Sequence, residues 1–578
     1  MKKSLYFIIV TLLSISVIKA QTTGGADFWL TFGNNYWGNT SGLDFQIRIV
    51  GGDSHTEGTI YFTALGTSAP FSLSPYEVYT LQLSPTQRAA VYNTTQGKSN
   101  KSIHITTNDN KAVTVYALNQ ASASTDATNI LPITVLDTAY YQISYRPITS
   151  GSDAYAVIAT ENNTNIYHNG DFVETLNAGE VYYKTSSTDM TGARINSTFN
   201  KPVAFFALNQ AAYIPYGVSN YDCLFQQLAP VNTWGKNFFV PTSHLGKDRV
   251  RIVVAENNTT ISLIGGTLKT DVMYAQDHLN NLMAGQFVEI EVTLAEKGCS
   301  ISADKRIGVC TYLTGIDYNG WGVSDPSQAW LPAIEQTTPN ALIAPFMPTG
   351  TSYLNAHYAL VMMPTEAKIN AKVSIGGGPP GTLTGTWYDN DDAGMSFCIM
   401  QLTNTTASYY FTNEAELIVM GYGVGNTESY YYLGYSAMRN LSAAFSANGV
   451  PYTKMADSLF CENEITFTTV ITGASEMDSI KWYKQKTSGN TPDLDYVLIT
   501  DIVEDPPLEW TRTFRAGNYM IKLEVYHNGE LEPLVYEGEL CVGAHITIYP
   551  TPNDGGMTKP TTGCYKVGTQ LPMEAYPY

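Results

Sequence analysis

The chain has 578 residues, which is long enough for several domains of roughly 100–200 residues each. Only 14% of the residues are charged, Tyr occurs 40 times, and the formal net charge is −19. This balance argues against nucleic acid or an anionic membrane surface as a partner, because binding to either requires a cationic face.

The first twenty residues predict a secretory signal peptide. Lys2 and Lys3 precede an apolar run from Leu5 to Ile18, and Ala20 then stands before a polar stretch. This pattern is typical of a leader that is cleaved before Gln21. No later run approaches the roughly 18 apolar residues that a spanning helix needs. We therefore expect a protein that is secreted or displayed on the outer cell surface, without direct membrane insertion.

One sequence pattern occurs four times along the chain. "NKAVTVYALNQ" (Asn110 to Gln120) matches "NKPVAFFALNQ" (Asn200 to Gln210) at an offset of 90 residues, and two weaker copies are "DKRIGVCTYLTG" and "EAELIVMGYGVG". Such self-similarity predicts tandem copies of one structural unit. We predict a repeat region over residues 21–446, with four units of about 100 residues. The expected units are 22–145, 146–243, 244–350 and 351–446.

Hydrophobic residues within each unit follow a period of two, and a helical period is nearly absent. "SIHITT" alternates, "DRVRIVVA" is rich in β-branched residues, and "DFVETL" follows an Asn-Gly turn at Asn169-Gly170. These signals predict six or seven short strands per unit and an all-β fold class. The four units could stand side by side as sandwiches, or they could close into a ring like a propeller.

A second recurring element is the stretch Glu-Asn-Asn-Thr, which begins at Glu161 and again at Glu256. Asn tolerates a left-handed backbone and bonds to its own chain, so this stretch predicts a turn that connects two strands. Asn162 and Asn257 also stand in glycosylation sequons.

The phrase Ala-Leu-Asn-Gln ends an apolar strand in the first two copies. Its polar residues are candidate ligand contacts at the mouth of the sheet. The alternative is that they satisfy backbone groups where the strand leaves the sheet. The residues concerned are Asn119, Gln120, Asn209 and Gln210.

Seven cysteines follow the leader, and export makes disulfides plausible. "CSISADKRIGVC" predicts a hairpin that turns at Asp304-Lys305, so that Cys299 faces Cys310 across two strands. The equivalent pairs in the other copies would be Ile105 with Tyr116 and Ile195 with Phe206. The alternative is that both thiols are reduced and buried. The cysteines without an assigned partner are Cys223, Cys398 and Cys564.

The repeat ends near residue 446, and residues 452–545 predict a separate sandwich. "AGNYMIKLEVY" resembles the late strand of PKD-like and immunoglobulin-like modules, and Trp482 stands on a strand between Cys461 and Cys541. A Cys461–Cys541 disulfide would join the first and last strands of this module. Residues 546–578 predict a linker followed by an incomplete β module.

No motif for catalysis stands out. The chain has no nucleophile elbow, no His-Glu-x-x-His, no phosphate loop and no dinucleotide fingerprint. "DNDDAG" (Asp389 to Gly394) resembles a calcium loop, but Ala393 stands where an oxygen ligand is required. We therefore predict a protein that is not an enzyme and that has no metal or cofactor.

Three stretches of the repeat region resemble a known family. They are "GADFWLTFGNNY" after the leader, the two "ALNQ" strands, and "QQLAPVNTWGKNFFVP" (Gln226 to Pro241) with its Trp-Gly-x-x-Phe element. These are similar to the N-terminal domain of the IgG Fc-binding protein family. The domain occurs in mucus-associated animal proteins and in exported bacterial proteins, so the resemblance implies a bacterial exported member with an extracellular recognition role.

Together these observations predict a non-catalytic adhesion protein that binds an extracellular glycoprotein, mucin or glycan through its β-repeat surface. Abundant Tyr suits such a contact surface. The alternatives are a polysaccharide-active enzyme and a structural spacer of a larger surface protein.

Overall fold

The computed structural model describes most of the chain after the leader, and the predicted signal peptide lies outside the described residues. The described ranges are 22–38, 42–198, 201–347, 354–438, 442–472, 477–488, 491–492, 497–498, 509–527, 534–546, 557–559, 562–572 and 574–576. Nearly all regular structure in these ranges is β, which confirms the predicted fold class. They form two compact units, within Gln21–Asn440 and within Leu441–Tyr578. No helix among them has the length and apolarity that crossing a membrane requires.

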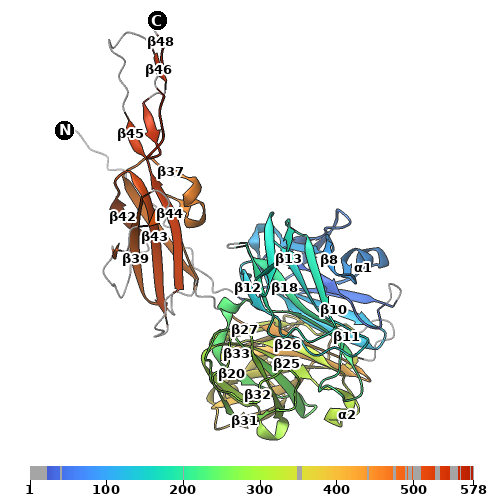
Figure 1. Ribbon diagram of the computed structural model, residues 1–578. Helices are drawn as coiled ribbons and strands as arrows, with labels where there is room; N and C mark the ends of the chain where they lie inside the picture. Colours follow the sequence, from blue (N-terminus) through green and yellow to red (C-terminus); the bar gives the residue numbers. More distant parts are fainter. Residues whose placement is uncertain are drawn as a thin grey trace, which may run out of the picture. The chain divides into compact units, whose positions relative to one another are not determined.

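The larger unit consists of four successive stretches of chain, each with an outer and an inner set of strands (Figure 1). The two sets form separate sheets in the first two stretches, whereas one long strand belongs to both sets in each of the other two. The first stretch contains β1 (Asp27–Leu30), β3 (Asp44–Gly51), β4 (Thr56–Phe62), β5 (Thr67–Leu73), β6 (Val78–Gln82), β9 (Ile103–Thr107), β10 (Val113–Ala121) and β11 (Ser124–Ile130). The second contains β12 (Ala139–Tyr141), β13 (Asp153–Ala159), β14 (Thr164–His168), β15 (Asp171–Leu176), β16 (Val181–Ser186), β17 (Arg194–Ser197), β18 (Val203–Ala212) and β19 (Asp222–Gln227).

The other two stretches have longer central strands. The third contains β20 (Gly235–Val240), β21 (Lys247–Val254), β22 (Ile261–Ile264), β23 (Thr267–Leu268), β24 (Phe287–Thr293), β25 (Cys299–Leu313) and β26 (Ser327–Leu331). The fourth contains β27 (Thr338–Ile343), β28 (Leu354–Pro364), β29 (Lys372–Ile375), β30 (Gly381–Thr382), β31 (Thr386–Asn390), β32 (Met395–Gln401), β33 (Tyr409–Gly425) and β34 (Glu428–Tyr435). Minor elements are β2 (Phe32–Gly33), β7 (Tyr92–Asn93), β8 (Gly97–Ser99), α1 (Pro85–Val91) and α2 (Ile316–Asn319).

The same pairing order occurs in all four stretches. In the outer sheet, β9, β17, β25 and β33 each pair with the first strand of their stretch on one side and with β4, β14, β22 or β29 on the other. In the inner sheet, β10, β18, β25 and β33 each pair with β3, β13, β21 or β28, and with the last strand of their stretch. The residue boundaries that the sequence suggests for the units stay predictions.

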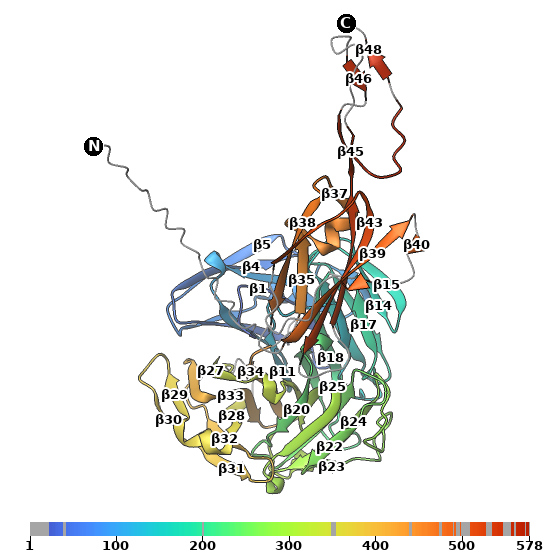
Figure 2. The same cartoon turned by 90° about the vertical axis from the view of Figure 1, so that its left-hand side faces the viewer.

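The last strands of the four stretches, β11, β19, β26 and β34, are neighbours in a closed cycle. β11 lies beside β19 and β34, and β26 lies beside the same two strands. Figure 1 shows β11 and β26 in the middle of the larger unit, and Figure 2 shows β11 next to β34. The cycle explains why "VTVYALNQA" in β10 is buried at every position, whereas "TEGTIYF" in the outer strand β4 alternates. The ring alternative therefore describes this unit.

The Glu-Asn-Asn-Thr stretches are turns, as predicted. Asn163 and Asn258 have φ values of 58° and 60°, in the left-handed region. In both copies the Thr hydroxyl donates to the Glu carbonyl oxygen, at 2.8 Å for Thr164 and 2.7 Å for Thr259. The same bonds form twice because the same four residues connect equivalent strands.

The predicted Cys299–Cys310 disulfide is wrong, because both thiols are free and buried. No hairpin forms at Asp304-Lys305. β25 continues without turning back, so the two cysteines are separated by on the order of 30 Å of strand, far beyond disulfide reach. Asp304 and Lys305 instead hold a neighbouring turn: the Asp304 carboxylate accepts from the Thr260 amide at 2.8 Å, and Lys305 Nζ donates to the Asn257 carbonyl oxygen at 2.7 Å.

The predicted couples of the other copies do not face each other either. Ile105 lies on β9 opposite Phe28 and Ile60, whereas Tyr116 lies on β10 in the inner sheet. Ile195 lies on β17 of the outer sheet, and Phe206 lies on β18 of the inner sheet. In each copy the chain passes from one sheet to the next in place of forming a hairpin.

The smaller unit has two main sheets whose facing side chains form a separate core. Trp482 is buried there, with its ring 5.5 Å from that of Phe467 on the opposite sheet. One sheet contains β35 (Ser442–Ala447), β36 (Val450–Pro451), β38 (Glu464–Thr472) and β42 (Glu509–Thr513). The other contains β37 (Leu459–Phe460), β39 (Met477–Ser488), β40 (Thr491–Pro492), β41 (Val497–Leu498), β43 (Gly517–His527) and β44 (Leu534–Val542). Two small ribbons follow: β45 (Ala544–Ile546) with β47 (Gly563–Tyr565), and β46 (Met557–Lys559) with β48 (Glu574–Tyr576).

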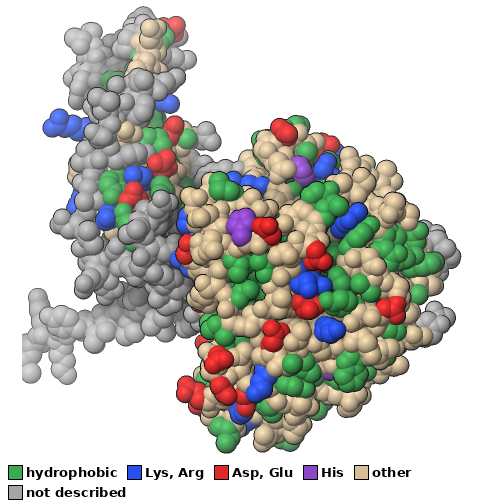
Figure 3. Space-filling model, turned by 60° about the horizontal axis from the view of Figure 1, so that its bottom comes forward, with side chains coloured by type: hydrophobic (Ala, Val, Ile, Leu, Met, Phe, Trp, Pro, Cys, Tyr) green, Lys and Arg blue, Asp and Glu red, His purple; other side chains and the backbone are tan. Residues whose placement is uncertain are grey.

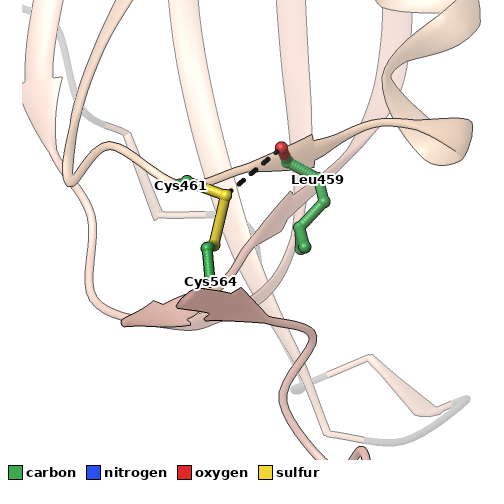
Figure 4. The surroundings of a disulfide bond; sticks show 3 residues. All are labelled: Leu459, Cys461 and Cys564. Atoms are coloured by element: carbon green, nitrogen blue, oxygen red, sulfur yellow. Dashed lines mark hydrogen bonds between the residues drawn. A yellow bond between two sulfur atoms is a disulfide. The ribbon is translucent and has the colours of Figure 1, made fainter. Parts of the chain in front are cut away.

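The predicted Cys461–Cys541 disulfide is also wrong. Cys461 pairs with Cys564, with 5.6 Å between the Cα atoms (Figure 4). Cys541 is a free, buried thiol. The reason is one of register: Leu459 lies opposite Cys541, and Cys461 lies beyond the end of β37. β47 pairs with β45, and this places Cys564 beside Cys461. The likeness of this unit to PKD or immunoglobulin-like modules stays a prediction.

Candidate functional site

The inner strands of the larger unit converge on a single buried carboxylate, that of Asp126 on β11. Its oxygens accept from the amides of Ala127 at 2.8 Å, Phe225 at 2.9 Å, Gln328 at 3.1 Å and Tyr431 at 3.3 Å. These four amides come from the four strands of the central cycle. Burial raises the pKa of Asp126 well above its usual range, and the four amide bonds oppose that shift.

The four donors occupy equivalent places in the sequence repeat. Each lies opposite the ninth residue of the repeated pattern, which is Leu118, Leu208, Tyr312 or Tyr422. Asp126 therefore links the four stretches through hydrogen bonds, and because its side chain is fully buried, a ligand cannot reach it.

The hairpins that carry these strands all turn at one end of the ring, which we name the hairpin face. The β10–β11 turn is short, with Ala123 at φ 60°, and so is the β33–β34 turn, with Thr427 at φ 55°. The β18–β19 loop spans residues 213–221, and the β25–β26 loop spans 314–326 and contains α2. The second and third stretches thus contribute most of the exposed chain on this face.

Three carboxyl groups occupy the buried mouth of the cycle at the hairpin face. Asp222, Asp325 and Glu428 are at most 3% exposed. Burial, followed by the charge of Asp325, raises the pKa of Asp222, and burial followed by Glu428 raises that of Asp325. Among the described residues, no group of three or more His, Cys, Asp or Glu has an arrangement that could hold a metal ion. The stretch "DNDDAG", which resembles a calcium loop in the sequence, covers the end of β31 and the turn before β32.

A row of aromatic side chains covers part of the hairpin face. Trp37 stacks parallel to Tyr221, with ring centroids 6.1 Å apart, and Tyr36 meets Tyr221 edge-on at 5.3 Å. Tyr213 contacts Tyr221 at 5.3 Å and Tyr216 at 6.2 Å. Trp37 is 47% exposed and Tyr216 is 39% exposed. We name these five residues the aromatic row; large rings of this kind offer a rigid surface with both apolar and polar contacts.

Next to the aromatic row lies a cleft of about 450 Å³, which we name the arginine cleft. Its walls include Arg146, Tyr216, Arg249, Arg251 and Met273, together with Tyr145, Pro215, Thr270, Asp271 and Val272. Tyr216 belongs to both the row and the cleft. Elsewhere on the surface, hydrophobic patches lie between neutral polar side chains and scattered charges (Figure 3).

The structure places the four predicted contact residues at the root of the hairpin face. Asn119 and Asn209 are buried, and their amides donate to the carbonyl oxygens of Gly33 at 3.0 Å and Tyr145 at 2.7 Å. Gln120 is buried, and Gln210 is half-buried with a Ser152 hydroxyl bonded to its side-chain oxygen at 3.3 Å. Asn119 and Asn209 thus satisfy backbone groups, while direct contact of any of the four with a ligand stays a prediction.

Sequence reasoning missed the aromatic row and the arginine cleft, although the repeat contains a signal for them. In the first copy the phrase "ALNQ" is followed by a turn of a few residues, whereas in the second the stretch "AAYIPYGVSNY" intervenes before the next strand. An insertion between equivalent strands that is rich in Tyr marks a loop free to serve binding. The sequon residues Asn162 and Asn257 lie exposed at the opposite end of their stretches.

Comparison with known proteins adds one match. The model of the family described as IgGFc binding protein matches residues 126–423, which is more than half of the chain and falls within the larger unit. No curated protein matches the chain significantly.

Proposed function

The chain belongs to the IgGFc binding protein family, and we propose that it is a non-catalytic protein that binds an extracellular glycoprotein, mucin or glycan through its hairpin face. The family suggests a binding role, and the abundance of exposed loop on this face gives that role a location. The proposal includes export from a bacterium and adhesion at its outer surface, on the support of the N-terminal segment with its basic start and apolar run.

The observation that carries the proposal is the aromatic row. Binding surfaces are enriched in Tyr and Trp because these rings bury a large area at a small entropic cost. Sugar rings also present apolar C–H faces that pack on aromatic rings. Trp37 exposes nearly half of its surface while it stacks on the Tyr221 ring, which is typical of a contact residue rather than of a core residue.

The test is an array of glycans, mucins and immunoglobulins probed with the full chain and with single-residue variants. We expect a specific ligand, and we expect Trp37→Ala and Tyr221→Ala to weaken its binding at least about tenfold, as central aromatic contacts do. The matched control is Phe172→Ala, because Phe172 is 58% exposed on the outer strand β15 and should leave binding unchanged.

The other outcomes identify the alternatives. Release of reducing sugar from mucin would favour a polysaccharide-active enzyme, and a folded protein with no ligand on any array would favour a structural spacer. Equal binding by the Trp37 variant and the unmodified protein would contradict the hairpin face as the binding surface.

A further inference from the structure

The arginine cleft brings together three guanidinium groups in a protein with few cations and a net charge of −19. Two of them are engaged by buried carboxylates, and the third is not. The cleft therefore offers a free cation at a defined place, beside the aromatic row.

Arg251 and Arg249 form the floor of the cleft. Arg251 bonds to Asp189 at 2.7 Å and to Glu289 at 3.0 Å, and its guanidinium lies 3.8 Å from the centroid of the Tyr145 ring. Arg249 lies 3.4 Å from Glu289 and donates to the Tyr318 hydroxyl at 2.8 Å. These bonds fix both side chains and compensate their charges, so the floor is rigid.

Arg146 lies on the wall and is arranged differently. Its guanidinium carbon lies over the Tyr216 ring, 3.7 Å from the ring centroid, in a cation–π contact. Among the described residues, no carboxylate oxygen lies within 4.0 Å of its nitrogens, and no hydrogen-bond acceptor contacts them. Asp271, the one carboxylate among the residues that line the cleft, is exposed and outside that distance. The donors of Arg146 are thus oriented and unused.

We propose that the arginine cleft binds the negatively charged group of an acidic glycan, a carboxylate or a sulfate ester, through Arg146. This inference rests on the proposed function and names the class of ligand. A guanidinium presents parallel N–H donors that match two oxygens of such a group, and stacking on an aromatic ring leaves those donors free. Tyr216 and the 49%-exposed Met273 supply apolar walls for the sugar ring.

The size of the cleft agrees with this assignment. A volume of about 450 Å³ is in the range of sites for small molecules, and it accommodates one sugar residue with its substituents. The rest of the glycan would then lie along the aromatic row, because Tyr216 borders both regions.

The test compares one glycan core in three forms: neutral, capped with a carboxylated sugar, and bearing a sulfate ester. Binding of the full chain is measured at physiological salt. We expect at least one acidic form to bind about 10- to 100-fold more tightly than the neutral core, the range for hydrogen bonds between charged groups. Arg146→Gln should abolish this preference, and its thermal unfolding midpoint is measured to show that it folds.

Arg194→Ala is the matched control, because Arg194 is an exposed arginine on the outer strand β17, outside the cleft. It should keep the preference for the acidic core, which excludes a general effect of net charge. The two acidic forms decide between carboxylate and sulfate ester.

Equal binding of the neutral and acidic cores, or an unchanged preference in Arg146→Gln, would overturn the inference. In that case binding that still depends on Trp37 would leave the proposed function standing. Absence of any binding by the unmodified protein to the cores and to free acidic monosaccharides would overturn the inference, and absence of a ligand on the array of glycans, mucins and immunoglobulins as well would overturn the proposed function.

Discussion

Asp126 illustrates how much one residue contributes to this architecture. Its carboxylate joins four strands that are far apart in the sequence, through amides at equivalent positions of the repeat. The residues that stand at its own position in the other stretches are Leu224, Ser327 and Tyr430, so the tie exists once and serves all four. The sequence does not distinguish this residue, because β11 is largely polar and the equivalent strands β19 and β34 also contain an acidic residue, so only the ring explains its partners.

Replacing Asp126 should therefore destabilise the larger unit strongly. Asp126→Ala leaves four buried amides without an acceptor, each at a cost of about 1–3 kcal/mol, so we expect the free energy of unfolding to fall by about 4 kcal/mol or more. Urea unfolding of the full chain measures this loss. The exposed Asp271→Ala variant should change the free energy of unfolding by no more than about 0.5 kcal/mol. A loss below about 1 kcal/mol in Asp126→Ala would show that the central amides find other acceptors.

The raised pKa of the buried Asp248 carboxyl makes the free energy of unfolding depend on pH. Burial raises its pKa from 3.8 to about 7, and bonds from the Ser243 amide and hydroxyl at 2.6 and 2.7 Å oppose the shift. The folded state thus binds the proton more tightly than the unfolded state. The contribution of this carboxyl to stability is complete below pH 4, is lost as the pH rises from 4 to 7, and amounts to roughly 4 kcal/mol.

The variant Asp248→Asn removes this titration and can keep both bonds to Ser243. We expect its free energy of unfolding, relative to the unmodified protein, to rise between pH 4 and pH 8. Urea unfolding at several pH values gives this difference directly, and other buried carboxyls cancel in it. The exposed Asp271→Asn variant is the control. A difference that stays constant with pH would show that Asp248 is ionised in the folded protein over the whole range.

At the scale of elements, local sequence patterns predicted the strands and turns whose formation depends on neighbouring residues. Period-two hydrophobicity identified the strands, and the Asn pairs identified the turns at Asn163 and Asn258, because each depends only on neighbouring residues. The hairpin at Asp304-Lys305 was wrong, since a polar pair in the middle of an apolar stretch has the same appearance in a turn and in a strand that crosses between sheets. In β25 the two side chains are polar because they hold the adjacent turn.

The state of the cysteines tests chemically whether β25 is a continuous strand or a hairpin. Peptide mapping without reduction should recover a Cys461–Cys564 link, and the other five cysteines should be free thiols. Because those five are buried, they should react with a thiol reagent slowly in the folded protein and rapidly in denaturant. Two variants distinguish the disulfide-bonded cysteines from the free ones. Cys461→Ser should leave Cys564 as a free thiol that reacts in the folded protein, whereas Cys299→Ser should expose no additional reactive thiol. A recovered Cys299–Cys310 link would contradict β25 as one continuous strand.

At the scale of the whole molecule, the larger unit is a ring whose first and last residues meet. The Thr23 amide donates to the Ser436 carbonyl oxygen at 3.1 Å, and the Tyr435 hydroxyl donates to Thr22 at 2.9 Å. The first and fourth stretches also join through the Tyr116 hydroxyl, which donates to the Leu342 and Gly434 carbonyl oxygens. Such contacts join residues more than 200 positions apart. The repeat in the sequence therefore could not distinguish a ring from a row of sandwiches.

A circular permutant distinguishes these two architectures in solution. A chain that begins at Gly170, continues to Met438, and returns through a short Gly/Ser linker to Thr22–Asn169 keeps every strand and opens only the exposed Asn169-Gly170 turn. Because the old ends lie side by side, we expect it to fold with the sheet content of the unpermuted unit and a free energy of unfolding within about 2 kcal/mol of it. Circular dichroism and urea unfolding measure both.

The matching deletion is the control for closure. Without residues 354–438, β11 and β26 lose β34, their shared neighbour, and the Asp126 carboxylate loses one of its four amides. In a ring this exposes the buried edge of two stretches, so the shortened chain should unfold at much lower urea concentration or aggregate. In a row of separate sandwiches the remaining three units would keep their own cores, so the deletion would leave their stability unchanged. The permutant would instead be destabilised, because a short linker cannot join the ends of a first and a last unit that lie far apart. A deletion that unfolds beside a permutant that folds is therefore the pair of results that only the closed cycle of β11, β19, β26 and β34 explains.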